Sequence, residues 1–322
     1  MSTSTETSTE TSTDTMTVTI TELAAEYGAP MSLERVARLA WTLVCEPGDV
    51  TAGVLIDELG AVAALDWVVG GGEENPDVAV LRERVLPRAD GGELRQLLRA
   101  VTEHGCTVLI PSDAGWPAGL LDLGTAAPYA LYVAGDASLL TVDAPRILVS
   151  GCRAATGYGE HATRDITAGL VAHGHIIFGT GSYGIAGMAH RAALASGGKT
   201  VVVSASGLGR TFPSGHDALL ARIAEVGAIV SELPPHRSPT RWTFIQRGRL
   251  AAALTDAVLV VEAGVRSGSL NEAAHAGALG RPVGAVPGPI TSVTSDGCVR
   301  LIREFGATLI STAEHAAELT RG

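Results

Sequence analysis

Residues 175–184, HIIFGTGSYG, combine an apolar run with a glycine-rich turn that follows it directly. The run His175–Phe178 is typical of a short buried strand. Gly179, Gly181 and Gly184 then give the spacing G-x-G-x-x-G, which in dinucleotide-binding folds follows a strand and opens a helix. Backbone N–H groups in such a turn can face an anion. The stretch therefore predicts a strand–loop–helix unit with a phosphate-binding loop.

A dinucleotide site also needs an acidic residue about twenty residues further on to hold the ribose. The next apolar run, Thr200–Val203, is followed by Ser-Ala-Ser-Gly, which contains neither Asp nor Glu. We therefore interpret the loop as a general phosphate site, with NAD as the minority alternative. Tyr183 at its tip either stacks on a nucleic-acid base or only covers the loop. Ser182 does not lie in a G-x-S-x-G turn, because residue 180 is Thr, so a hydrolase nucleophile is not expected.

Similar apolar runs alternate with amphipathic helices over the C-terminal half of the chain. They lack polar–apolar alternation, as expected when helices cover both faces of a parallel sheet. The predicted fold is α/β, with an extended Rossmann-like, doubly wound, mostly parallel sheet. The nine predicted strands are Thr107–Ile110, Tyr129–Val133, Ile147–Ser150, His175–Phe178, Thr200–Val203, Ala228–Ser231, Ala257–Glu262, Val283–Val286 and Thr308–Ile310.

The N-terminal part has a different pattern. Residues 1–19 are rich in Ser, Thr and Glu, cannot form a core, and are expected to be disordered. Residues 20–102 predict a small helical domain. Ser32 is the predicted N-cap of its first helix, and further helices are expected over residues 50–59, 62–69 and 92–102. The extended Rossmann-like domain is then expected over residues 103–322.

The charge distribution bears on the choice of ligand. The chain carries a formal net charge of −11. Residues 1–144 hold 7 basic and 22 acidic side chains, whereas residues 145–322 hold 16 basic and 12 acidic ones. Phosphate binding depends on the local field, so a net charge of +4 over the second region is compatible with a nucleic-acid ligand.

Several other classes of protein are not expected. No apolar run reaches about 18 residues, and the first residues lack the basic and apolar segments of a signal peptide, so we expect a cytoplasmic protein without membrane association. The four cysteines are far apart and the nine histidines lack metal-ligand spacing, so neither a metal nor another cofactor is expected.

Three further loops could hold a ligand at the carboxyl ends of the strands. In residues 150–159, Gly151, Arg153 and Thr156 lie between a strand and a helix, where an arginine can neutralise an anion; the alternative is a plain turn with a solvated arginine. Residues 237–249 interleave four arginines with Trp242 and Phe244, which suits phosphates and bases of a single strand. Alternatively, the two aromatic rings belong to the core.

The third of these loops is residues 262–272. Gly268 keeps a helix N-terminus open, and Arg266 and Ser267 add groups that suit a phosphate. Ser269 with Glu272 has the spacing of a capping box. The alternative is a well-capped helix without a ligand.

The chain also carries a set of motifs that occur together in one known family. They are Trp116-Pro117, Leu123-Gly124 with Ala127-Pro128, Arg153 with Thr156-Gly157-Tyr158-Gly159, Ala189-His190-Arg191, Phe212-Pro213, Ser231-Glu232-Leu233-Pro234, Phe244 with Arg247 and Arg249, Arg266-Ser267-Gly268-Ser269-Leu270, and Val286-Pro287-Gly288. With these motifs, residues from about Gly105 to Ile310 resemble the DNA-processing protein A (DprA/Smf) family, and the helical part around Cys45–Gly48 resembles its N-terminal domain more loosely.

The resemblance implies an extended Rossmann fold, a homodimer, and binding of single-stranded DNA without catalysis. It also implies protection of that DNA and loading of the RecA recombinase, in natural transformation or recombination. The candidate DNA-binding residues are Gly151, Arg153, Thr156, Gly181, Ser182, Tyr183, Gly184, Lys199, Phe244, Arg247, Arg249, Arg266, Ser267, Gly268 and Ser269.

This sequence departs from the family pattern at several positions. Tyr183 stands where a basic residue is usual, Ala186 where Asp is usual, Gly248 lies between the two arginines of an Arg-Asn-Arg run, and Val299 occupies a usual Asn. The C-terminal winged-helix domain of many members is also expected to be absent. The alternative hypothesis is that the protein is a nucleotide sensor or a nucleoside-monophosphate phosphoribohydrolase-like enzyme. The Ser267–Ser269 run with Glu272 partly matches the glycine-rich loop and helix glutamate of such enzymes.

Overall fold

The computed structural model describes residues 19–28, 31–70, 76–103, 105–210 and 212–321. A single nine-stranded sheet runs through most of it, in the order β1-β2-β6-β5-β4-β3-β7-β8-β9. The strands are β1 Thr107–Leu109, β2 Leu131–Gly135, β3 Arg146–Ser150, β4 Ile176–Thr180, β5 Thr200–Val203, β6 Ala228–Ser231, β7 Ala257–Val260, β8 Val283–Ala285 and β9 Thr308–Leu309.

The sheet is mostly parallel. All pairs from β6 through β9 are parallel, whereas β2 pairs antiparallel with both β1 and β6. Leu148 on the interior strand β3 lies between Phe178 of β4 and Val258 of β7. The predicted α/β, mostly parallel Rossmann-like fold is therefore confirmed, and each of the nine predicted strands is present.

Both faces of the sheet are covered by helices, which explains the apolar strands. On one face, Leu148 and Val258 pack with residues of α10, α11 and α12; on the other, Ile147 and Leu259 pack with residues of α7, α8 and α13. Neighbouring residues of one strand therefore enter different cores, and no position needs to be polar. The helices are α7 Gly157–Ala172, α8 Ile185–Ala195, α9 Asp217–Val226, α10 Arg241–Ala253, α11 Ser269–Ala278, α12 Asp296–Glu304 and α13 Ala313–Glu318.

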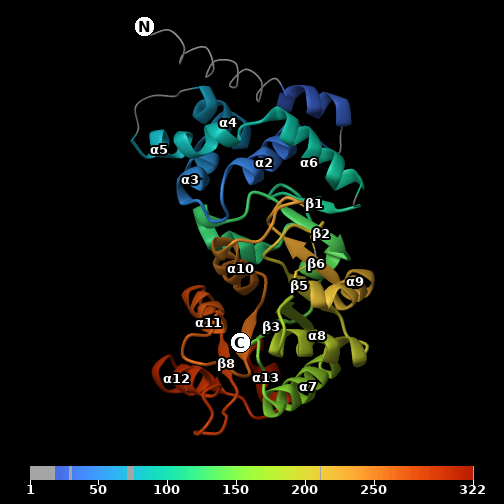
Figure 1. Ribbon diagram of the computed structural model, residues 1–322, viewed down its shortest axis with the longest axis vertical. Coiled ribbons are helices and arrows are strands. Elements are labelled where there is room, and N and C mark those ends of the chain that lie inside the picture. The colour runs from blue at the N-terminus through green and yellow to red at the C-terminus, as the bar shows by residue number, and fades with distance from the viewer. Residues whose placement is uncertain (1–18, 29–30, 71–75, 104, 211, 322) are drawn as a thin grey trace.

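The N-terminal helices gather at one end of the elongated molecule, beyond β1 and β2 (Figure 1). Residues 19–27 are helical. The remaining helices are α2 Leu33–Val44, α3 Val50–Leu59, α4 Ala61–Gly70, α5 Pro76–Val85 and α6 Gly91–Glu103, with the 3₁₀ helices η1 Leu86–Arg88, η2 Ala118–Ala126, η3 Ala137–Leu140 and η4 Ser214–His216 further along the chain. Residues 1–18, on which the predicted disordered tail falls, lie outside the described residues.

The helical end packs directly on the sheet. Ser32 caps α2 as predicted, accepting from the Arg35 backbone N–H at 3.2 Å. The core of this end includes Trp41 and extends to Tyr132 of β2, whose hydroxyl lies 2.8 Å from the Thr42 hydroxyl. None of the helices within the described ranges is long and apolar enough to span a bilayer.

Candidate nucleic-acid interface

Two glycine-rich loops pack on each other where β3 and β4 end. The loop after β4, residues 181–184, lies against the loop after β3, because the Ile185 N–H donates to the Cys152 carbonyl at 3.2 Å. Gly184 has a φ of +73°, and a Cβ there would collide with the carbonyl oxygens of Cys152 and Arg153. The last glycine of the fingerprint therefore permits a close approach between two protein loops, and this contact places Arg153 beside residues 181–184.

A buried carboxylate holds the first loop in place. Glu262, just beyond β7, accepts hydrogen bonds from the Thr156 N–H at 2.9 Å and the Thr156 hydroxyl at 2.6 Å. Thr156 also caps α7 by accepting from the Gly159 N–H at 3.2 Å. Thr156, a predicted DNA-binding residue, therefore uses its hydrogen-bonding groups on Glu262 and on the N-terminus of α7. It fixes the loop that carries Arg153.

The structure brings Arg153, Phe244 and Arg247 together around one pocket. The guanidinium carbons of Arg153 and Arg247 lie 5.5 Å and 5.4 Å from the centre of the Phe244 ring. Phe212 packs edge-on against the same ring, with centroids 5.3 Å apart. The Arg153–Phe244 pocket, which these four side chains line together with residues including Gly268, has a volume of about 500 Å³.

Arg247 is the buried cation of this pocket. Its side chain is 10% exposed, and its guanidinium reaches only a long contact of 3.4 Å with Glu272. Its buried Nε has no hydrogen-bond partner among the described residues. Burial lowers the pKa of Arg247; Glu272 opposes this effect and the nearby Arg153 adds to it. An anion bound between the two arginines would relieve their mutual repulsion.

The predicted capping box of Ser269 with Glu272 is wrong. Gly268 is the N-cap of α11 and makes no side-chain hydrogen bond, while Ser269 is the first helical residue. Glu272 turns inward and accepts from the Ser150 hydroxyl and from Arg247. The sequence pattern predicted that the Glu272 carboxylate would cap the helix, but it bonds instead to the buried donors of Ser150 and Arg247.

Two predicted DNA-binding residues have other surroundings. Arg249 forms a buried two-bond ion pair with Glu232, at 2.9 and 3.0 Å, and donates twice to the Ala126 carbonyl. Its guanidinium therefore joins α10 to η2 and has no free face toward the pocket. Lys199 lies just before β5, at the amino ends of the parallel strands and so away from the glycine-rich loops, and donates to the Val226 carbonyl at 3.0 Å.

The remaining candidates lie on exposed loops or close by. Arg153, Tyr183 and Arg266 are exposed, and neither arginine forms an ion pair within the described ranges. The Ser267 hydroxyl lies 2.8 Å from the Ser269 hydroxyl. The prediction missed Glu262, which no local pattern reveals, and did not include Phe212, although Phe212-Pro213 is one of the family motifs.

The fold and this pocket together define a Rossmann-like protein in which two loops and helix α10 present arginine and aromatic side chains to a ligand. A family model described as DNA recombination-mediator protein A matches residues 107–321. The chain belongs to this family, as the resemblance in sequence predicted.

Individual relatives in sequence and in structure come from the same family. The putative DNA processing protein DprA of Mycobacterium tuberculosis is 42% identical over 287 residues, covering 85% of this chain and 72% of the relative. Protein Smf of Escherichia coli is 38% identical over 211 residues, covering 65% and 56%. Among solved structures, DprA of Streptococcus pneumoniae superposes with a TM-score of 0.73 at 28% identity, covering 88% of this chain and 96% of that one.

DprA of Helicobacter pylori superposes with a TM-score of 0.59 at 26% identity, covering 67% of this chain and 96% of that one. Its structure is described as giving insight into a single-stranded DNA binding mode. These relatives support a role of this chain in DNA processing in transformation or recombination.

Proposed function

We propose that this chain binds single-stranded DNA at the Arg153–Phe244 pocket and has no catalytic role of its own. One observation carries the proposal: two guanidinium groups flank a single aromatic ring in the pocket, and one of them, Arg247, is buried with only a long contact to Glu272. Guanidinium groups suit backbone phosphates, and aromatic rings suit unstacked bases. The DNA-binding relative from Helicobacter pylori supports the same ligand.

Replacement of Arg153 tests the proposal. Arg153 is exposed and has no ion-pair partner within the described residues, so Arg153→Ala removes a phosphate contact without leaving a buried charge unpaired. We expect the affinity for oligo-dT at moderate salt to fall about tenfold, and equally for other single-stranded sequences. Fluorescence anisotropy measures this. Lys199→Gln, which removes a cation at the amino ends of the strands, is the matched control and should bind as the parent does.

The result that would sink the proposal is an Arg153→Ala protein that holds oligo-dT as tightly as the parent. The same samples test the rival enzyme: release of phosphoribose from AMP would assign the pocket to a free nucleotide. Both carboxylate oxygens of Glu272 are engaged by Ser150 and Arg247, which leaves neither free to act as the catalytic base of such a reaction.

We further propose a RecA-type recombinase as the protein partner. The family description as a recombination mediator supports this assignment. A mediator acts by delivering bound DNA to the recombinase, so the chain should shorten the lag in recombinase ATPase activity on single-stranded DNA. Arg153→Ala should lengthen that lag again.

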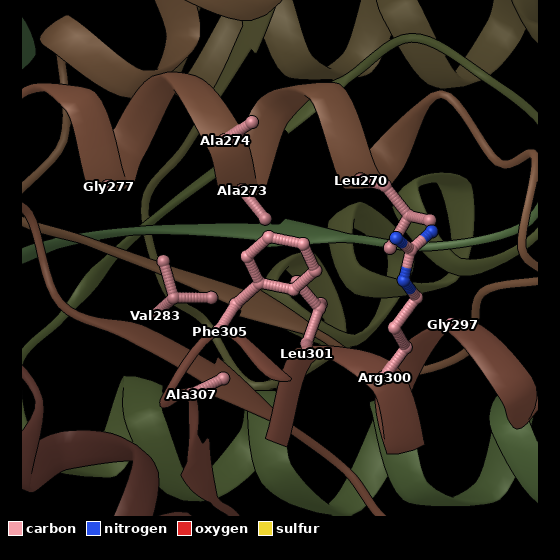
Figure 2. Close-up of a pocket in the computed structure, with 10 residues that line it drawn as sticks. All are labelled: Leu270, Ala273, Ala274, Gly277, Val283, Gly297, Arg300, Leu301, Phe305 and Ala307. Carbon is pink, nitrogen blue, oxygen red and sulfur yellow. The ribbon is translucent and has the colours of Figure 1, made fainter. Parts of the chain in front are cut away.

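We also propose that the chain forms a homodimer through α12 and β9. Strand β9 is an edge of the sheet, and edge strands are common sites of pairing between chains. An apolar pocket of about 380 Å³ lies beside it, between α11 and α12. Figure 2 shows Phe305 and Leu301 facing Ala273 across this pocket. Phe305 is 66% exposed, and a second copy of the chain would cover it.

A further inference from the structure

The tip of the 181–184 loop carries an aromatic ring fixed on a histidine. The Tyr183 ring packs edge-on against His216, with centroids 4.6 Å apart and planes at 71°. His216 is buried and donates from Nδ1 to the Gly181 carbonyl at 3.0 Å, so that it is anchored to the loop it supports. Tyr183 nevertheless remains 46% exposed. The ring is thus held in one orientation with a free surface.

An arginine lies at the same place. The position that a Cβ would take at Gly187 is 2.6 Å from His216 Cε1, 3.1 Å from Arg191 Nη1 and 3.1 Å from the Ser182 carbonyl oxygen. Arg191, on α8, therefore brings its guanidinium beside His216 and the loop. It is exposed and forms no ion pair within the described ranges, not even with Asp217, which follows His216 in the chain.

We propose that Tyr183 and Arg191 form a second nucleotide subsite on the single-stranded DNA track, next to the Arg153–Phe244 pocket. Arg191 contacts a backbone phosphate and the exposed Tyr183 ring stacks on a base. The inference rests on the proposed function.

The two subsites are continuous. The Phe212 ring lines the Arg153–Phe244 pocket, while the Phe212 carbonyl oxygen lies 3.1 Å from the position that a Cβ would take at Gly181. The Arg153 carbonyl likewise lies against Gly184. The loop that ends in Tyr183 is thus in contact with the pocket on two sides, and a strand that leaves the pocket along this loop reaches the Tyr183 ring next.

The test separates the phosphate contact from the base contact. Binding is measured by anisotropy for oligo-dT and for an abasic oligonucleotide of the same length, over a range of salt concentrations. Arg191→Gln should weaken binding of both about fivefold and reduce the slope of log K against log salt by about 0.7. Tyr183→Leu should weaken oligo-dT binding about tenfold and leave the abasic strand unchanged, because only a base can stack on the ring.

Controls keep the outcomes distinct. Arg191→Lys keeps the charge and should restore the salt slope, and Lys199→Gln should leave every value as in the parent. A Tyr183→Leu protein that loses affinity for both strands, or an Arg191→Gln protein with the parent's affinity and slope, would overturn the second subsite. In either case an effect of Arg153→Ala would leave the proposed function intact. Absence of any binding by the parent would overturn both.

Discussion

Arg247 and Arg249 differ in role although they are separated by one residue. Arg247 lines the pocket with an incompletely bonded guanidinium, whereas Arg249 is fully bonded to Glu232 and to the Ala126 carbonyl. Because they are two positions apart on α10, the two side chains point to different sides of the helix. The sequence cannot show which side meets the ligand, because Glu232 and Ala126 come from distant parts of the chain. Arg153 could be predicted, since its loop position alone exposes it.

The buried ion pair of Arg249 predicts a large loss of stability on substitution. The side chains of Arg249 and Glu232 are 6% and 7% exposed, so Arg249→Met should lower the free energy of unfolding by about 3–5 kcal/mol, because it leaves a buried carboxylate unpaired. The exposed pair Arg222–Glu225 is the control, and Arg222→Met should cost at most about 0.5 kcal/mol. Urea denaturation followed by circular dichroism measures both. Equal losses in the two variants would contradict the structural role of Arg249.

At the scale of elements, the apolar pattern predicted the strands well and the helices less completely. All nine strands were found because buried strands are short, apolar and bounded by turn residues. Helices α5 and α13 were missed: α5 is short and carries Asp77, Arg82 and Arg84 among few buried residues. The antiparallel pairing of β2 with β1 and β6 was not predicted either, since strand direction in a sheet depends on distant partners.

The edge element β9 and the neighbouring α12 carry a prediction about assembly. Phe305→Arg should shift the protein from a dimer to a monomer of 32.9 kDa in sedimentation velocity, because a charge replaces an apolar contact at the proposed interface. Ile290→Arg is the matched control: Ile290 is 93% exposed and apolar, but lies in the loop before α12. A parent that sediments as a monomer at tens of micromolar would contradict this interface, and so would a dimer that only Ile290→Arg disrupts.

For the whole molecule, a net charge of −11 is unfavourable for DNA binding. The structure shows why this overall charge does not exclude a DNA ligand at the pocket. The acidic residues of the helical end nearest the pocket are neutralised internally. Glu46 pairs with Arg88 at 3.0 Å and with Arg237 at 3.3 Å, and Asp49 pairs with Arg84 at 2.6 Å. Arg153, Arg191 and Arg266 have no such partner within the described ranges. A DNA strand would therefore contact unpaired arginines near the carboxyl ends of the β-strands.

Binding of single-stranded DNA by these arginines and aromatic rings is tested by a salt titration with single- and double-stranded oligonucleotides of the same sequence. With three or four arginines engaged, log K for the single strand should fall against log salt with a slope of about −2 to −3. The duplex should bind more weakly at every salt concentration, because its bases are not available to the aromatic rings. Equal affinity for the two forms, or a single-strand affinity that does not change with salt, would contradict the account.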